Sequence, residues 1–208
     1  MHREVLTERG AEVYGFLNRF DDFYLAGGTG LALQLGHRIS VDFDLFIDGA
    51  IKRSLLPKVQ TVFGPSRSIS LLVNNPEELT VLIDEVKVTV LSYPFPTFDP
   101  FVSLDGVFAL SVREIAATKA YTIGRRGSFK DYADLYFVLG GGHASLKEVI
   151  DLAERKFGDV FNSRLFLEQI VSVDDLEDTE IEFLAPPVDQ EEVRAFFERQ
   201  VREYTTTA

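Results

Sequence analysis

The sequence predicts an α+β fold, with a mixed β-sheet core flanked by helices in residues 1–100 and a helical domain in residues 101–208. Strand-like runs interleaved with helical periodicity up to residue 91 predict the sheet core. After residue 110 the apolar spacing becomes helical, and helix-start signals recur. The length of 208 residues, with 46% apolar and 26% charged residues, suits one globular domain or a domain with a helical extension.

The first half contains the elements of the predicted sheet core. Apolar residues at helical spacing predict helices at residues 4–20, 31–35 and 51–63. Short apolar runs predict strands at residues 23–26, 41–47, 68–73, 79–83 and 86–91. Asp84 and Glu85 form a two-residue loop between the last two strands, which predicts a β-hairpin. The prolines in residues 93–96 are expected to end the sheet, because proline cannot donate a ladder hydrogen bond.

The second half carries the signals of helix starts and ends. Ser111, Ser128 and Ser145 are each followed three residues later by an acid, which is the pattern of a capping box. Three glycines at 140–142 are expected to end the second of these helices. An acidic linker at 173–187 and a last helix near 190–204 are expected to follow.

Composition excludes several classes of protein. The chain has no cysteine, so a disulfide framework, a thiolate metal site and a cysteine nucleophile are excluded. Apolar runs are too short to span a bilayer, and the charged N-terminus does not match a signal peptide, so we expect a cytoplasmic protein with no membrane partner. The net charge of −12 argues against a protein that coats nucleic acid, but a local basic groove for RNA stays open. Residues 151–208 are the most acidic part of the chain and would suit a basic protein partner.

Two aspartates alternate on one predicted strand. Asp42 and Asp44 should point to the same face, whereas Val41, Phe43 and Leu45 should point into the core. Two carboxylates on one face repel each other unless a cation lies between them, and a hard cation such as Mg²⁺ prefers oxygen ligands. The alternative for this pattern by itself is a solvated strand face with two unrelated acids.

Gly27, Gly28 and Thr29 lie between a predicted strand and a predicted helix. Twelve residues separate Thr29 from Asp42, the first of the two aspartates. Glycines at this place let backbone N–H groups approach a phosphate, and the helix N-terminus favours an anion. A tight turn alone would also explain the glycines. The order of strand, glycine turn, helix and aspartate strand is a more specific pattern than either motif.

Two segments together resemble a known family. The sequence YLAGGTGLALQLGHRISVDFDLF and, about 85 residues later, LSVREIAATKAYTIGRRGSFKDYADLYFVL are similar to the motifs of the AbiEii/AbiGii toxin nucleotidyltransferases. That family belongs to the DNA polymerase β-like nucleotidyltransferase superfamily. The resemblance implies a nucleotidyltransferase-like core and the Mg²⁺-dependent transfer of a nucleoside monophosphate from a nucleoside triphosphate to an acceptor. It further implies a toxin with a separate antitoxin, and an acceptor expected to be the 3′ end of tRNA.

The resemblance also implies roles for single residues. Asp42 and Asp44 would bind the metal, and the turn of Gly27, Gly28 and Thr29 would contact the triphosphate. The resemblance further implies that Lys119 neutralises phosphate charge and that Asp131 and Asp134 are the two acids of the later motif, either of which could act as the base. Arg38, from its position, and Arg126, from its basic surroundings, are further candidates to contact phosphate or RNA.

Each of these remaining candidates has a structural alternative. Arg38 and Lys119 could be ordinary surface cations. Asp131 could only cap its helix, and Asp134 could pair with Lys130 at i, i+4. His37 is expected to have a structural role.

The sequence departs from the superfamily at one position. Many members carry a third carboxylate on a later strand, and alternation places Thr89 there. A hydroxyl cannot replace the charge of a carboxylate, so a catalytically impaired nucleotide- or protein-binding descendant stays open as an alternative function. A small-molecule nucleotidyltransferase is the other alternative, because the acidic balance suits a small acceptor better than tRNA.

Overall fold

The computed structural model describes residues 1–123, 125–126, 128–173, 176 and 180–207. The chain forms two compact units. Unit 1 consists of Met1–Pro96 and Pro100–Leu110, and unit 2 consists of Thr97–Asp99 and Ser111–Ala208. Unit 1 holds the sheet and unit 2 is helical, which confirms the predicted α+β class.

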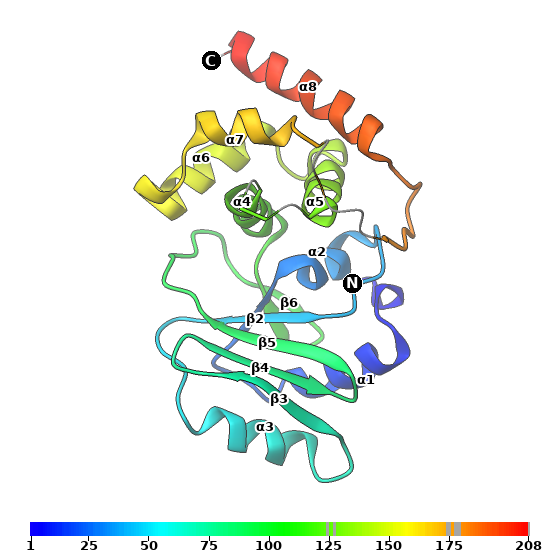
Figure 1. Ribbon diagram of the computed structural model, residues 1–208, viewed down its shortest axis with the longest axis vertical. Coiled ribbons are helices and arrows are strands. Elements are labelled where there is room, and N and C mark those ends of the chain that lie inside the picture. The colour runs from blue at the N-terminus through cyan, green and yellow to red at the C-terminus, as the bar shows by residue number, and fades with distance from the viewer. Residues whose placement is uncertain (124, 127, 174–175, 177–179, 208) are drawn as a thin grey trace. The chain divides into compact units, whose positions relative to one another are not determined.

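Unit 1 is built on a seven-stranded mixed sheet (Figure 1). The strand order is β3-β4-β5-β2-β1-β7-β6. The pairs β1–β7 and β2–β5 are parallel and the other neighbours are antiparallel. The strands are β1 (Tyr24–Ala26), β2 (Phe43–Ile47), β3 (Ile69–Asn74), β4 (Glu78–Ile83), β5 (Val86–Ser92), β6 (Val102–Leu104) and β7 (Val107–Ala109).

The sheet continues beyond the prolines of residues 93–96, so the expectation that it ends there is wrong. Strands β6 and β7 form a hairpin, and β7 pairs in parallel with β1 through Leu25 and Ala109. The Leu110 N–H then donates to the Leu25 carbonyl at 2.9 Å. Prolines interrupt a strand locally, but they do not prevent a later segment from returning to the same sheet.

One face of the sheet carries the apolar core of unit 1. Helices α1 (Glu8–Leu17) and α3 (Leu55–Phe63) contribute to the same buried cluster as Phe43 and Leu45 of β2. Val41 is 49% exposed, so the expectation that it joins this core is wrong, because β2 begins only at Phe43. The opposite face receives the alternate residues of each strand, including Asp44.

The predicted hairpin between β4 and β5 is confirmed. Asp84 and Glu85 have φ values of 48° and 73°, the left-handed conformation that a two-residue hairpin loop requires. The Asp84 carboxylate accepts a hydrogen bond from the Ser68 N–H at 2.9 Å and pairs with Arg67 at 2.7 Å. These bonds offset the strain of a non-glycine residue at positive φ.

Unit 2 is helical throughout its described elements. The 3₁₀ turns are η1 (Arg3–Val5) in unit 1 and η2 (Gly158–Val160) in unit 2. The helices of unit 2 are α4 (Val112–Thr122), α5 (Phe129–Gly140), α6 (Leu146–Phe157), α7 (Ser163–Ile170) and α8 (Gln190–Thr207). Helices α4 and α6 pack through the stacked rings of Tyr121 and Phe157, with centroids 4.2 Å apart. None of the helices among the described residues has the length and apolar character that crossing a membrane requires.

The three predicted capping boxes have different outcomes. At α6 the reciprocal bonds between Ser145 and Glu148 are both present. At α4 the Ser111 side chain caps the helix, but the Glu114 carboxylate instead accepts the Phe98 and Asp99 N–H groups and pairs with Lys156 at 2.5 Å. Ser128 makes no side-chain cap at α5, so the capping box expected there is wrong.

Candidate functional site

The glycine motif forms the first turn of α2 (Gly27–Leu35), rather than a separate loop before the helix. Gly27 has a φ of 62°, and a Cβ at this position would collide with Oδ2 of Asp44. Two features therefore disfavour a side chain at Gly27: the positive φ of its backbone and the lack of room beside Asp44. The first N–H groups of a helix have no intrahelical partners, so this turn presents donors beside the carboxylate of Asp44.

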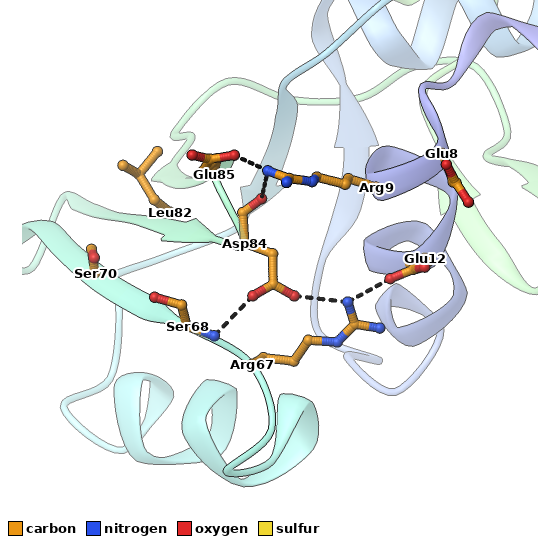
Figure 2. Close-up of a pocket in the computed structure, with 9 residues that line it drawn as sticks. All are labelled: Glu8, Arg9, Glu12, Arg67, Ser68, Ser70, Leu82, Asp84 and Glu85. Atoms are coloured by element: carbon orange, nitrogen blue, oxygen red, sulfur yellow. Dashed lines mark hydrogen bonds and ion pairs between the residues drawn. The ribbon is translucent and has the colours of Figure 1, made fainter.

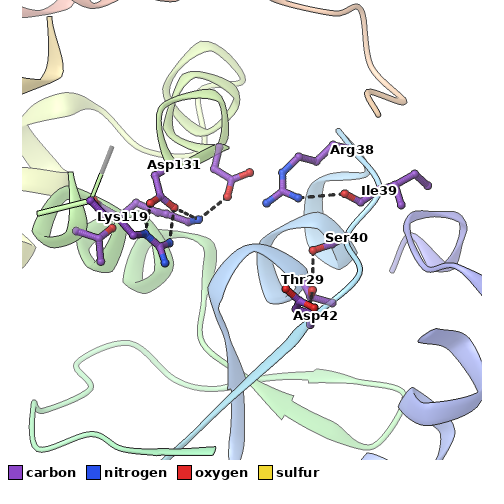
Figure 3. Close-up of polar contacts among 10 residues, drawn as sticks. Thr29, Arg38, Ile39, Ser40, Asp42, Lys119 and Asp131 are labelled. Atoms are coloured by element: carbon purple, nitrogen blue, oxygen red, sulfur yellow. Dashed lines mark hydrogen bonds and ion pairs between the residues drawn. The ribbon is translucent and has the colours of Figure 1, made fainter. Parts of the chain in front are cut away.

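Thr29 ties the start of α2 to the chain that enters β2. Its side chain is 2% exposed, its Oγ1 lies 2.7 Å from Ser40 Oγ, and it donates to the Asp42 carbonyl (Figure 3). These contacts hold the backbone of Asp42 next to the helix N-terminus. Contact of Thr29 with a triphosphate stays a prediction.

The two aspartates come from different local structures. Asp44 lies in β2, whereas Asp42 precedes the strand, two residues earlier in the chain. The carboxylate of Asp42 is 45% exposed and its Oδ2 lies 3.1 Å from Nζ of Lys87 on β5. Lys87 therefore offsets part of the negative charge at the aspartates, a partner that the sequence analysis did not identify.

The donor set suits a hard divalent cation. Carboxylate oxygens are preferred ligands of Mg²⁺, which commonly binds one or two protein carboxylates and completes its shell with water and phosphate oxygens. Within the described part of the chain, no group of three or more acidic, histidine or cysteine side chains forms a metal site. Two carboxylates match the number that Mg²⁺ commonly takes from a protein, and binding of Mg²⁺ by Asp42 and Asp44 stays a prediction.

Thr89 lies where the sequence placed it. It is the register partner of Asp44 across the parallel pair of β2 and β5, so both side chains point to the same face. Thr89 is 8% exposed and its Oγ1 lies 3.3 Å from that of Thr80 on β4. A buried pair of hydroxyls thus occupies the position next to Asp44 where related enzymes would carry an acid.

Arg38 is not a surface arginine, because only 4% of the residue is exposed. Its Nη1 donates to the Ile39 carbonyl at 3.0 Å, between the end of α2 and the start of β2. His37 is 2% exposed, which agrees with the structural role expected for it. Binding of phosphate by Arg38 stays a prediction.

A second group of predicted residues lies within unit 2, on α4 and around α5. Nζ of Lys119 lies 2.6 Å from a carboxylate oxygen of Asp131 and 2.6 Å from one of Asp134. Arg126 holds Asp131 through two bonds, from Nε at 2.6 Å and from Nη2 at 2.8 Å (Figure 3). The formal charges of these four side chains, named here the Lys119 cluster, cancel.

Three of the four side chains in the Lys119 cluster are buried. The side chains of Lys119, Asp131 and Asp134 are 6%, 1% and 0% exposed, so the solvated-lysine alternative is wrong. Asp131 binds the two cations rather than capping its helix, and Asp134 pairs with Lys119, so the alternatives proposed for both acids fail. Burial by itself would raise the pKa of Asp131, but Lys119 and Arg126 outweigh it and hold that pKa below its usual value. Asp131 is therefore ionised and a weak base at neutral pH.

Arg126 is the solvent-facing member of the Lys119 cluster, with 61% of its side chain exposed. A guanidinium in this position can bind a second anion, such as a phosphate, while it keeps Asp131. The sequence identified the residue from its basic surroundings, but not its carboxylate partner.

A separate open pocket of about 540 Å³ lies in unit 1 beside α1 and the β4–β5 turn. Figure 2 shows its ion pairs: Arg67 contacts Glu12 at 2.5 Å and Asp84 at 2.7 Å, and Arg9 pairs with Glu85. None of the predicted site residues lines it. Arg9, Glu12, Arg67, Asp84 and Glu85 are paired within the wall, which suits a structural role in holding the hairpin.

Comparison with known proteins gives one family. A model of the family described as "Nucleotidyl transferase AbiEii toxin, Type IV TA system" matches residues 15–206. An uncharacterised protein of Aquifex aeolicus is 34% identical over a 192-residue alignment that covers 88% of this chain and 88% of that one. The crystal structure of JHP933 from Helicobacter pylori superposes with a TM-score of 0.59, at 16% identity over 97% of this chain and 94% of that one.

The nucleotidyltransferase toxin MenT4 from Mycobacterium tuberculosis gives a TM-score of 0.57, at 16% identity over 89% of this chain and 76% of that one. At such identities these structures support the shared fold. The family match covers the glycine turn, both aspartates and the Lys119 cluster. The chain therefore belongs to the AbiEii nucleotidyltransferase toxin family.

Proposed function

We propose that this nucleotidyltransferase moves a nucleoside monophosphate from a nucleoside triphosphate to the 3′ hydroxyl of an RNA, with tRNA as the expected acceptor. The observation that carries the proposal is the placement of Asp44 against Gly27, at the N-terminus of α2. Phosphate donors and metal-binding carboxylates thus occupy one short stretch of unit 1.

The N-terminus of α2 supports the binding of the triphosphate. Backbone N–H groups of the first turn point out of the helix, and the helix dipole adds a partial positive charge. The absence of side chains at Gly27 and Gly28 leaves the backbone accessible to phosphate oxygens. Thr29 and Ser40 keep this turn fixed relative to Asp42.

Asp42 and Asp44 would hold Mg²⁺, which in such enzymes neutralises phosphate charge and orients the phosphates for in-line displacement. Lys87 next to Asp42 limits the repulsion between the two carboxylates and can also contact phosphate. The Thr89 hydroxyl adds no charge, so the acid–base step needs another group. The base roles expected for Asp131 and Asp134 stay predictions, because both side chains are buried in ion pairs with Lys119.

The RNA backbone would meet the basic residues of unit 2. Arg126 is exposed and already held by Asp131, so its guanidinium is oriented for a phosphate contact. Lys119 pairs with both acids of its cluster. A basic antitoxin is the proposed protein partner, in keeping with the acidic residues 151–208.

The test is incubation of the purified protein with Mg²⁺ and each of four α-labelled nucleoside triphosphates, with and without total tRNA. Asp42→Ala is the matched inactive variant, and its side chain is 45% exposed, so the fold should survive. Label that appears on tRNA with wild type and disappears with Asp42→Ala supports the proposal and identifies the nucleotide. Label found on a small molecule instead of tRNA would show that the acceptor is a small molecule rather than RNA. Full activity of Asp42→Ala would refute the role of the two aspartates.

The toxin assignment is tested by expression in a bacterial host. Growth arrest by wild type but not by Asp42→Ala would tie toxicity to nucleotidyl transfer. Arrest by both variants would show that toxicity has another origin.

A further inference from the structure

Asp42 lies immediately before β2, where the register pairs of the sheet begin. Strand β2 pairs with β5 from Phe43 and with β1 from Asp44, so these pairs include Asp44 but not Asp42. Contacts outside the register pairs therefore contribute to the position of Asp42. One of them comes from the first turn of α2, where the Thr29 hydroxyl donates to the Asp42 carbonyl.

A one-way series of hydrogen bonds, named here the hydroxyl relay, leads from Ser40 through Thr29 to Asp42 (Figure 3). A carbonyl oxygen only accepts, so Thr29 gives its single hydroxyl proton to Asp42. Oγ of Ser40 lies 2.7 Å from Oγ1 of Thr29, and the proton in this contact must come from Ser40. Ser40 is therefore the first donor of the relay, and Thr29 both accepts and donates.

Both hydroxyls of the relay are buried. Thr29 is 2% exposed and Ser40 is 8% exposed, so water competes little for their hydrogen bonds. The Ser40 N–H donates to the Val5 carbonyl at 2.9 Å, which fixes the backbone of Ser40 to the N-terminal turn η1. Donation from Thr29 to a phosphate oxygen would require its bond to Asp42 to break, because the hydroxyl has no second proton.

We propose that Ser40 and Thr29 are positioning residues, which strengthen metal binding by holding Asp42, and that Thr29 does not bind the triphosphate. This role rests on the metal site proposed above and differs from the triphosphate contact expected for Thr29. Partners that hold a metal ligand typically contribute roughly 10- to 100-fold to metal affinity. Thr29 holds the backbone of Asp42 rather than its carboxylate, so we expect the lower end of this range.

The experiment measures metal binding and nucleotide binding separately, and neither measurement depends on transfer. Mn²⁺ takes the place of Mg²⁺ as the probe, because electron paramagnetic resonance reports its free concentration, and the titration contains no nucleotide. Binding of each of the four nucleoside triphosphates is measured by calorimetry in EDTA. Thr29→Val keeps the shape of the side chain and removes its hydroxyl, whereas Thr29→Ser keeps the hydroxyl.

Thr80→Val is the matched control for the loss of a buried hydroxyl. Thr80 is 5% exposed and lies on β4, in the sheet of unit 1. Its hydroxyl contacts Glu78 and Thr89 instead of Asp42. Asp42→Ala gives the metal affinity that remains when the ligand itself is removed.

Thr29→Val should bind Mn²⁺ about 10-fold more weakly than wild type and should bind the nucleoside triphosphates as wild type does. Thr29→Ser and Thr80→Val should keep the Mn²⁺ affinity of wild type, and Asp42→Ala should lose at least as much as Thr29→Val. Ser40→Ala should weaken Mn²⁺ binding less than Thr29→Val. Adding Ser40→Ala to Thr29→Val should cause no further loss, because both residues act through one relay.

Weaker binding of nucleoside triphosphate by Thr29→Val, with Mn²⁺ affinity unchanged, would overturn the proposal and assign Thr29 to the triphosphate. An equal loss of Mn²⁺ affinity in Thr80→Val would also overturn it, because the loss of any buried hydroxyl would then have the same effect. So would additive losses for Ser40→Ala and Thr29→Val, or Mn²⁺ binding that Asp42→Ala leaves intact. Failure of nucleotidyl transfer would be visible separately, as Thr29-dependent Mn²⁺ binding by a protein that labels no acceptor.

Discussion

Replacing Lys119 by methionine tests how much of the stability of unit 2 depends on its buried charges. The ammonium lies 2.6 Å from carboxylates of Asp131 and Asp134, whose side chains are 1% and 0% exposed. Breaking a buried ion pair from one side typically costs about 3–5 kcal/mol, because a charge is left buried without a partner. Arg126 still compensates Asp131, so we expect the lower end, about 3 kcal/mol, mainly from Asp134.

The assay is urea unfolding at pH 7, followed by far-UV circular dichroism because helices dominate unit 2. Lys147→Met is the matched control: the same side chain is removed from an ion pair with Asp151, but both partners are largely exposed. Its denaturation midpoint should stay at that of wild type. Adding Asp134→Asn to Lys119→Met should recover most of the loss, since the uncompensated charge is then gone. A Lys119→Met variant as stable as wild type would refute the reasoning.

Three further perturbations follow from the geometry. Gly27→Ala should abolish transfer and lower the midpoint of thermal unfolding, because its Cβ displaces the carboxylate of Asp44 and its φ of 62° disfavours a side chain. Gly15→Ala, with open space around it, should keep full activity; equal activity of both would contradict the steric argument. Lys87→Ala should lower the Mg²⁺ concentration for half-maximal activity several-fold, because a cation that competes for Asp42 is removed. If a Mg²⁺ titration shows that this concentration is unchanged or higher, Lys87 would be assigned to phosphate instead. Because the pKa of Asp131 is lower in the folded than in the unfolded state, its ionised carboxylate stabilises the fold above the unfolded-state pKa of about 3.9. This stabilisation is lost as the pH falls from there toward the folded-state pKa. Asp131→Asn should therefore lose less stability than wild type in acid unfolding below about pH 4, and parallel losses would disprove the ion-pair origin.

The Lys119 cluster shows why motif positions are easier to predict than partners. Lys119 and Asp131 were identified from the sequence as candidates, but local spacing suggested a helix cap for the acid and solvent for the lysine. The ion pairs join α4 to α5 across a loop, and side chains that far apart in the chain meet only through packing of the two helices. Helical periodicity describes one helix at a time, so it carries no information about which faces will meet.

Sequence patterns predicted the order of most strands and helices, the hairpin at Asp84–Glu85, and the shared strand face of Lys87, Thr89 and Leu91. These depend on local periodicity and turn preferences, or on strand alternation, and a linear pattern records them directly. Three-dimensional packing alone shows that β7 pairs with β1, that Lys87 contacts Asp42, and that the rings of Phe46 and Tyr93 stack. These contacts join segments distant in the chain, and their formation depends on strand order and register, which side-chain chemistry along a single segment does not specify.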